Sequence, residues 1–164
     1  MTELEIGFGY SCVLFRLAKL HSDRNFIGIE IDSTRMRHYE NVLQKYSNVE
    51  LVVGNVKSFI IKLESESFCR IHIYFPTPLP RNQRYFNKNF VYEIYRILEK
   101  DGAVKIVTDC LEYFNYIEKL FDNDNWMIVP WGKLEYITNM HSIVETDCER
   151  KYGSRYYSEW RKIT

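Results

Sequence analysis

Hydrophobic residues along this chain form short runs that alternate with segments of helical periodicity. The short runs are rich in β-branched residues and predict strands over residues 2–6, 25–31, 49–53, 69–75 and 103–108. Between and after them, apolar positions three or four apart predict helices over residues 11–21, 33–46, 56–63, 87–99 and 111–121. Strands that alternate with helices predict an α/β, Rossmann-like fold, with a mainly parallel central sheet flanked by helices on both faces.

Capping and turn residues set the expected boundaries of these elements. Ser33 is a favourable N-cap for the second helix, and Asp101-Gly102 reads as a turn into the fifth strand. Aromatic and β-branched residues after position 121 predict the last strands. We expect residues 1–164 to form a single domain whose first strand begins almost at Met1, with no segment ahead of it to cover the sheet.

A glycine turn follows the first predicted strand, and an acid ends the second. Gly7 and Gly9 form the turn, and Glu30 lies just over twenty residues later. This spacing is typical of a nucleotide-like cofactor site, where glycines let the backbone approach the ligand and the acid accepts hydrogen bonds from ribose hydroxyls. The next helix opens without the third glycine of the dinucleotide fingerprint, which packs the helix closely beneath a pyrophosphate. A site for a pyrophosphate is therefore disfavoured.

Glu5 narrows the choice of cofactor further. A carboxylate beside the turn would repel phosphate but suits a sulfonium or an ammonium group, which favours S-adenosylmethionine. An ordinary solvated acid at the end of the strand is the alternative interpretation.

Other polar residues also come one position after a predicted strand, where parallel strands present their carboxyl ends to a ligand. Asn55 could hydrogen-bond an adenine edge, or be a common turn asparagine. Thr108-Asp109 follows the fifth strand. Three prolines in residues 76–80 predict a rigid loop that holds a substrate, or a stiff turn without chemistry.

Composition limits the classes of partner. The formal net charge is +0, so a polyanion would have to bind a local basic patch. The 4 cysteines show no metal-ligand spacing, and we expect no metal. The sequence has no signal peptide and no apolar run long enough to span a membrane, which predicts a cytoplasmic protein.

Five motifs, in order and in spacing, resemble the tRNA (guanine-N7)-methyltransferase family over nearly the whole chain. They are Glu5-Ile6-Gly7-Phe8-Gly9, Gly28-Ile29-Glu30, Phe75-Pro76-Thr77-Pro78, Thr108-Asp109 and Thr146-Asp147-Cys148-Glu149. The resemblance implies a class I methyltransferase fold that uses S-adenosylmethionine to methylate N7 of a guanosine in the tRNA variable loop.

The resemblance also implies roles for single residues. The expected cofactor contacts are Glu5, Gly7, Gly9, Glu30, Asn55, Val56 and Phe75. The expected substrate contacts are Arg81, Asp109, Thr146 and Glu149, with Thr77 and Asp109 at the catalytic positions. Carboxylates suit guanine because its N1–H and amino group are donors.

The chain departs from the family pattern at several of these positions. The family usually has aspartates where this chain has Thr77 and Asn55, and a denser basic run than residues 81–88, which hold three cations. The family's usual segment before the first strand is missing. These departures leave two alternatives to methylation of tRNA. In the first, the enzyme methylates a small nitrogen heterocycle, in a pocket that would include Phe75, Leu79, Tyr85 and Trp131. In the second, the protein is a degenerate paralogue without turnover. A monomer and a homodimer are both compatible with the sequence.

Overall fold

The computed structural model describes residues 1–10, 13–78, 85–129 and 156–163. Its strands are β1 (Thr2–Ile6), β2 (Asn25–Glu30), β3 (Val49–Val53), β4 (Phe68–Tyr74), β5 (Leu98–Thr108), β6 (Trp126–Val129) and β7 (Tyr156–Lys162). Its helices are α1 (Leu14–Leu20), α2 (Ser33–Leu43), α3 (Val56–Ile60), α4 (Lys88–Ile97) and α5 (Leu111–Phe121). None of these helices is long and apolar enough to cross a membrane.

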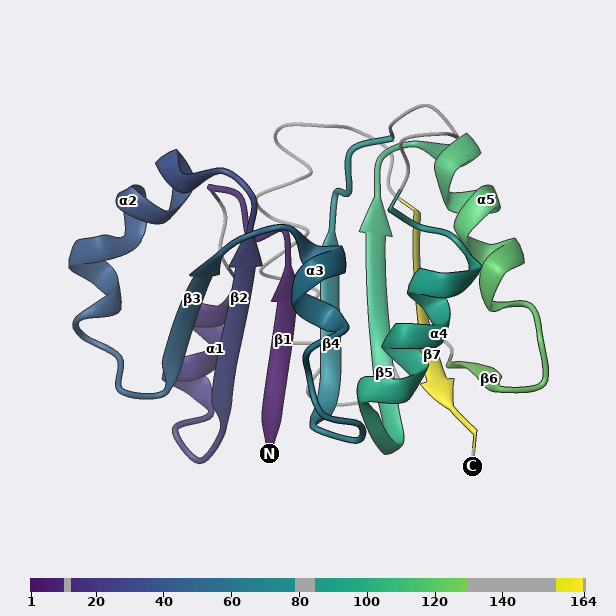
Figure 1. The fold of residues 1–164 in the computed structure, drawn as a ribbon, viewed down its shortest axis with the longest axis horizontal. Helices are drawn as coiled ribbons and strands as arrows, with labels where there is room; N and C mark the ends of the chain where they lie inside the picture. The colour runs from purple at the N-terminus through teal and green to yellow at the C-terminus, as the bar shows by residue number, and fades with distance from the viewer. Residues whose placement is uncertain (11–12, 79–84, 130–155, 164) are drawn as a thin grey trace.

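The strands form one sheet in the order β3-β2-β1-β4-β5-β7-β6 (Figure 1). β1 to β5 pair in parallel, whereas β7 is antiparallel to both β5 and β6. The chain moves outward from β1 to β3 and then crosses back to β4, so β1 and β4 lie at the switch point of the sheet. In open α/β sheets, ligands bind beyond the carboxyl ends of the strands at this point.

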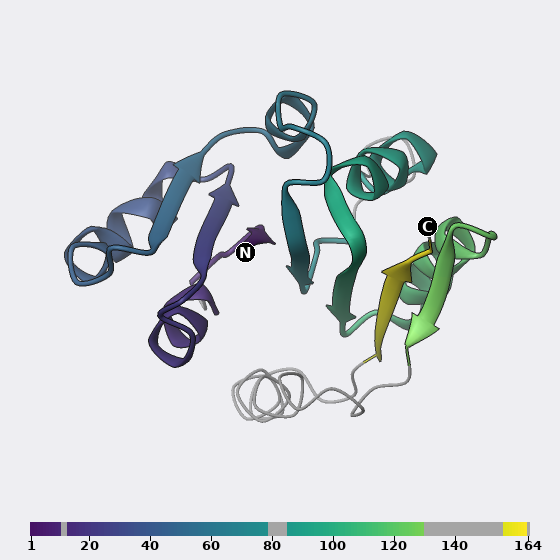
Figure 2. The same ribbon diagram turned by 90° about the horizontal axis from the view of Figure 1, so that it is seen from below.

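Helices cover both faces of the sheet, as the sequence predicts (Figure 2). On one face, α1 and α2 pack against β2 and β3 around Phe8, Phe26 and Leu51. On the other, α3, α4 and α5 pack against the centre of the sheet, where Ile71, Ile106 and other side chains are fully buried. The α/β fold with a mainly parallel sheet is therefore confirmed.

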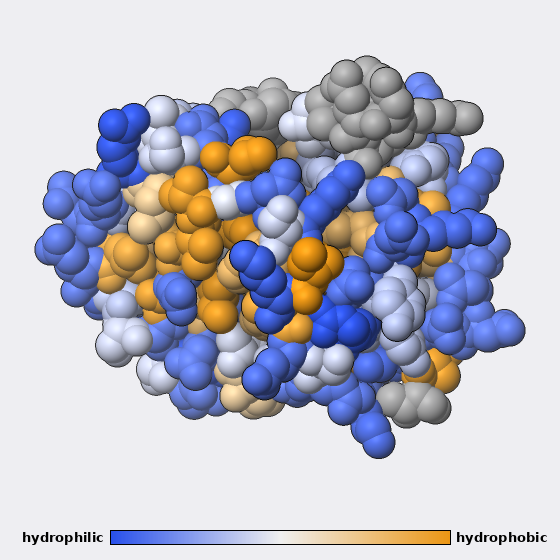
Figure 3. All heavy atoms as spheres, viewed as in Figure 1, coloured by the Kyte–Doolittle hydropathy of each residue, from blue (hydrophilic) through white to orange (hydrophobic). Residues whose placement is uncertain are grey.

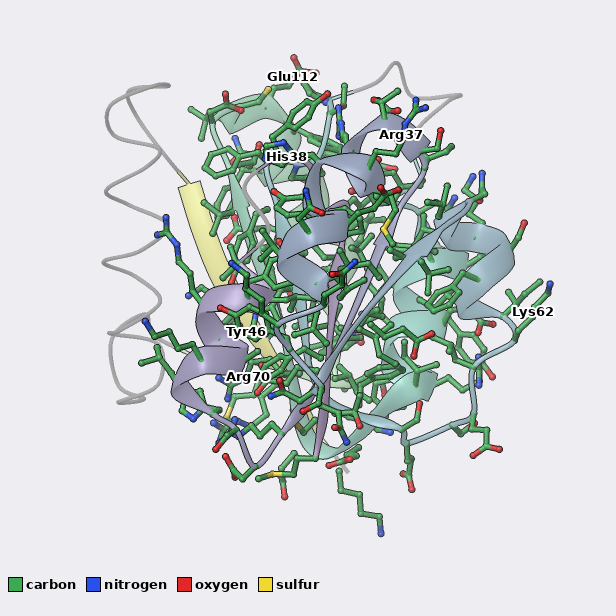
Figure 4. All side chains as sticks on the ribbon, turned by 90° about the vertical axis from the view of Figure 1, so that its left-hand side faces the viewer. Arg37, His38, Tyr46, Lys62, Arg70 and Glu112 are labelled. Atoms are coloured by element: carbon green, nitrogen blue, oxygen red, sulfur yellow. The ribbon has the colours of Figure 1, made fainter. Side chains whose placement is uncertain are left out.

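The central strands carry polar side chains on the face opposite α3 to α5. Apolar Leu4, Ile71 and Val104 face those helices, so the alternating residues lie on the other side of the sheet. There, His72 is paired in register with Glu5 and Lys105, and Lys105 is paired with Glu159. These four side chains are at most 1% exposed. Figure 4 shows Arg70 on this side, next to α1, whereas Lys62 lies beyond α3 on the other.

His72 is held between two hydrogen-bonding partners in this polar face. Its Nε2 lies 2.8 Å from Glu3 Oε2, and its Nδ1 lies 3.0 Å from the Tyr74 hydroxyl. Burial lowers the pKa of His72, although the hydrogen bond and the charge of Glu3 act to raise it. The sequence places His72 in the fourth strand as a core residue, and its position as a buried, paired side chain agrees with a structural role.

Acid should therefore destabilise the protein through His72. Its folded-state pKa lies below its unfolded value of about 6.5, so the unfolded chain binds more protons and stability falls as pH drops below about 6.5. We expect the wild type to lose about 1 kcal/mol more than His72→Gln between pH 7.5 and 5.5, within the limit of about 1.4 kcal/mol per pH unit for one proton. Urea unfolding at both pH values measures the difference, and equal losses would contradict it.

Several element boundaries differ from the sequence prediction. Asp32, not Ser33, caps α2, because its carboxylate accepts a 2.8 Å hydrogen bond from Thr34 N. The first helix begins at Leu14 rather than at residue 11, and the third ends at Ile60 rather than at residue 63. β5 begins at Leu98 and runs through the predicted turn, where Asp101 has a positive φ of 59° beside an irregularity in the pairing with β4.

Candidate functional site

A pocket of about 550 Å³ lies beyond the carboxyl ends of β1, β2 and β4. Its size lies within the range of small-molecule and cofactor sites. The residues that line it are Ile6, Gly7, Ile29, Glu30, Ile31, Asp32, Arg35, Gly54, Asn55, Val56, Lys57, Tyr74, Phe75, Pro76, Thr77 and Tyr85. It therefore lies at the switch point of the sheet, and it contains six of the residues that the sequence assigned to a cofactor or catalytic site.

The glycine turn after β1 forms one wall of this pocket. Gly7 and Gly9 have φ values of 76° and 54°, a backbone conformation that side chains strongly disfavour. Gly7 N donates a 2.8 Å hydrogen bond to Ile29 O, which ties the turn to β2. A Cβ at Gly7 would meet no atom within 4 Å, so the pocket is open at the turn and a ligand can approach its backbone.

Glu30, the last residue of β2, places a carboxylate at the edge of the pocket. The side chain is only 3% exposed, and backbone N–H groups hold it in place. Oε1 accepts hydrogen bonds from Ile31 N at 2.8 Å and Asp32 N at 3.1 Å. Oε2 accepts from Gly9 N at 3.0 Å, which joins the acid to the glycine turn. The predicted pairing of the turn with the acid is thus a physical contact in the fold.

Glu5 lies elsewhere. The sequence analysis placed its carboxylate beside the turn as a cofactor contact, whereas Glu5 lies within β1, is 1% exposed and is absent from the lining of the pocket. Its Oε2 accepts hydrogen bonds from Val13 N at 3.1 Å and Leu14 N at 3.3 Å. The carboxylate therefore satisfies the first N–H groups of α1, and it supports the glycine turn from behind.

Asn55 lies at the edge of the pocket, but its amide oxygen is already used. Oδ1 accepts from Lys57 N at 2.9 Å and from Ser58 N at 3.4 Å, which caps α3. The amide nitrogen is then the group that can address a ligand, and it is a donor only. An adenine ring nitrogen, rather than the adenine amino group, is the matching partner.

The loop after β4 forms the opposite wall of the pocket. Phe75 has a φ of 49°, rare for a residue with a side chain, and its N donates a 2.7 Å hydrogen bond to Val107 O. This turn directs Pro76 and Thr77 into the pocket lining. Thr77 is exposed, so its hydroxyl is available to a ligand. Asp109, the other predicted catalytic residue, is exposed but is not among the residues that line this pocket.

Several pocket residues were not predicted by the sequence analysis. Asp32, Arg35 and Lys57 bring charges to the site, and hydrogen bonds from Thr34 hold the pKa of Asp32 below its usual value. Ile31 is 69% exposed beside Glu30, as an apolar surface for a flat ring requires. Figure 3 shows apolar side chains gathered on the surface over β2 and β3. Of these residues, only Ile31 could have been assigned to the pocket from the sequence, because it directly follows Glu30.

Tyr85 also lines the pocket, and its environment is apolar. Burial raises the pKa of the phenol well above its usual value, with smaller contributions from Tyr113 and Glu30. The Tyr85 ring packs edge-to-face on Phe90, with centroids 5.2 Å apart.

Arg81, Thr146, Glu149, Leu79 and Trp131 lie outside the described residues, so their roles stay predictions. Among the described residues, no cluster of ligating side chains could hold a metal ion.

The chain is similar in sequence to known methyltransferases. The model of a family described as "Putative methyltransferase" matches residues 1–161. The chain is 28% identical to a tRNA (guanine-N(7)-)-methyltransferase of Wolinella succinogenes, over 97% of this chain and 39% of that protein. It is 30% identical to one of Mesomycoplasma hyopneumoniae, over 94% of this chain and 80% of that protein.

The fold is similar to solved structures with the same architecture. A crystal structure of a 30S ribosomal A1408 methyltransferase from an uncultured bacterium superimposes with a TM-score of 0.67, at 21% identity, over 99% of this chain and 87% of that one. The chain spans half or less of the length of the first curated relatives that it matches.

Proposed function

Because the chain belongs to the methyltransferase family that includes the tRNA (guanine-N(7)-)-methyltransferases, we propose that it methylates N7 of a guanosine in the variable loop of tRNA. The observation that carries the proposal is the pocket at the switch point, where the Glu30 carboxylate contacts the left-handed glycine turn. In this proposal, residues 1–164 form one methyltransferase domain.

The pocket fits the adenosyl part of S-adenosylmethionine. The open space at Gly7 admits a ligand against the backbone, and Glu30 offers an acceptor for ribose hydroxyls. Ile31 and Val56 supply apolar surface for adenine, and Asn55 supplies a donor to a ring nitrogen. When bound, S-adenosylmethionine supplies an electrophilic methyl group on a sulfonium.

The chemistry asks for alignment more than for proton transfer. Guanine N7 carries an exposed lone pair, so no base has to remove a proton before it attacks. The rigid turn at Phe75 and Pro76 holds Thr77 in the pocket, where its hydroxyl can hydrogen-bond the target base. In this proposal Thr77 orients the base, a role that the family usually gives to an aspartate.

Binding of tRNA at low salt tests the choice of substrate. We expect an unmodified tRNA transcript to bind at 50 mM salt and to lose at least tenfold in affinity at 200 mM, because phosphate contacts release counterions. Arg81→Ala and Arg84→Ala each remove one cation of the run over residues 81–88, and each should weaken binding. Lys62→Ala removes an equal charge beyond α3 and should not. Filter binding measures all four proteins.

The same titration can exclude tRNA. If the wild type shows no binding at 50 mM salt, tRNA is not the substrate, and small nitrogen heterocycles become the acceptors to test.

A further inference from the structure

Arg35 is paired with Glu30, the carboxylate that the proposed function assigns to the ribose. Its Nη1 lies 3.0 Å from Glu30 Oε2, and the guanidinium lines the pocket. With the bonds from Gly9 N, Ile31 N and Asp32 N, four donors reach this carboxylate within the described residues. A carboxylate has about four lone-pair sites, so its capacity is already filled.

Of these four donors, Arg35 is the one that can leave. The other three are backbone N–H groups of the glycine turn and of the start of α2, and their positions are fixed by the fold. Arg35 is a flexible side chain that is 38% exposed. It has alternative partners beside it: Nε lies 3.6 Å from Asp32 Oδ2, and its Cζ lies 5.6 Å from the centroid of the exposed Tyr10 ring.

We propose that Arg35 competes with the ribose hydroxyls for Glu30, so that its release sets the affinity of the pocket for a ligand with a 2′,3′-diol. This inference rests on the proposed function, because it takes the pocket to hold an adenosyl group. In the free protein, Arg35 keeps the carboxylate paired. On binding, a ribose hydroxyl replaces its N–H group at Oε2, and the guanidinium moves to Asp32 and Tyr10.

Calorimetric titration with two neutral nucleosides tests the competition. 5′-Methylthioadenosine carries the diol, whereas 2′,3′-dideoxyadenosine lacks it. We expect Arg35→Ala to bind 5′-methylthioadenosine about two- to fivefold more tightly than the wild type at low salt, the range that a partly exposed ion pair allows. The advantage should shrink in 0.5 M salt, which screens the pair in the wild type. The dideoxynucleoside should bind both proteins equally.

Two matched variants serve as controls. Arg37→Ala removes the same charge from the exposed surface of α2 and should bind like the wild type; Figure 4 labels Arg37 on this helix. Arg35→Lys keeps a cation near Glu30 and should also stay close to the wild type.

Equal or weaker binding of 5′-methylthioadenosine by Arg35→Ala would overturn the competition, since Arg35 would then be neutral or would hold the ligand itself. A different result marks failure of the proposed function. If neither the wild type nor the variant binds 5′-methylthioadenosine although circular dichroism shows both to be folded, the pocket holds no adenosyl group, and both proposals fail.

Discussion

Glu30→Ala is expected to weaken binding of S-adenosylhomocysteine by about tenfold to a hundredfold. The carboxylate lies in the pocket at the end of β2, where release of Arg35 leaves Oε2 free to accept a hydrogen bond from a ribose hydroxyl. A hydrogen bond to a charged group contributes about 1.5–3 kcal/mol, so losing it costs about one to two factors of ten in affinity. The substitution also frees Gly9 N, which loosens the glycine turn against β2. Isothermal titration calorimetry measures the change.

Two further variants locate this effect. Glu30→Gln keeps an acceptor oxygen and should lose less affinity than Glu30→Ala. Glu50→Ala removes an exposed carboxylate from the neighbouring strand β3 and should bind like the wild type. An affinity of Glu30→Ala within threefold of the wild type would show that this carboxylate does not hold the ribose.

Glu5→Ala is expected to lower the free energy of unfolding by about 2–4 kcal/mol. The side chain is 1% exposed and accepts hydrogen bonds from Val13 N and Leu14 N. Removing it leaves these donors buried without an acceptor, at a cost of about 1–3 kcal/mol each. The loss also removes the contact that holds the start of α1 against β1, so the glycine turn between them should become less ordered.

Urea unfolding followed by circular dichroism measures the cost. Glu5→Gln retains one acceptor oxygen and should lose less than half as much stability. Glu50→Ala, on an exposed strand position, should stay within about 0.5 kcal/mol of the wild type. If Glu5→Ala unfolds at the same urea concentration as the wild type but loses cofactor affinity, Glu5 contacts the ligand directly, as the family resemblance implied, and does not mainly support α1.

The sequence was most informative where the hydrophobic pattern alone set both ends of an element. The strand over residues 2–6 and the helix over residues 111–121 have the predicted bounds. The start of α1 was not predictable, because its first N–H groups are satisfied by Glu5, a strand residue eight positions away. The start of β5 was missed because Asp101-Gly102, a common turn pair, lies within the strand at an irregular pairing.

The candidate site shows the same division. The glycine turn and Glu30 could be read from the sequence because their spacing reflects a fixed geometry, strand to turn to helix to strand. Arg35 could not, because its contact with Glu30 depends on the direction of a side chain in the first turn of α2. Asn55 was assigned to adenine, but capping of α3 claims its oxygen first. Local hydrogen bonds of this kind compete with ligand contacts and are not visible in a motif.

The polar face of the sheet is also visible in the sequence, as an alternation of polar and apolar residues in two central strands. Residues 70–74 alternate polar and apolar side chains, as do residues 3–6. Central strands of parallel sheets usually read as continuous apolar runs, so this alternation marks a face with a different environment. The structure places Glu3, His72 and Lys105 there, nearly inaccessible to solvent.

Transfer of a labelled methyl group tests the central claim most directly. Wild type and Glu30→Ala are incubated with S-adenosylmethionine carrying a labelled methyl group and an unmodified tRNA transcript, and the product is cleaved at 7-methylguanosine. We predict that the wild type places label at one guanosine of the variable loop and that Glu30→Ala places almost none. If the folded wild type leaves the tRNA unlabelled, or labels a position other than guanine N7, the proposed function is wrong.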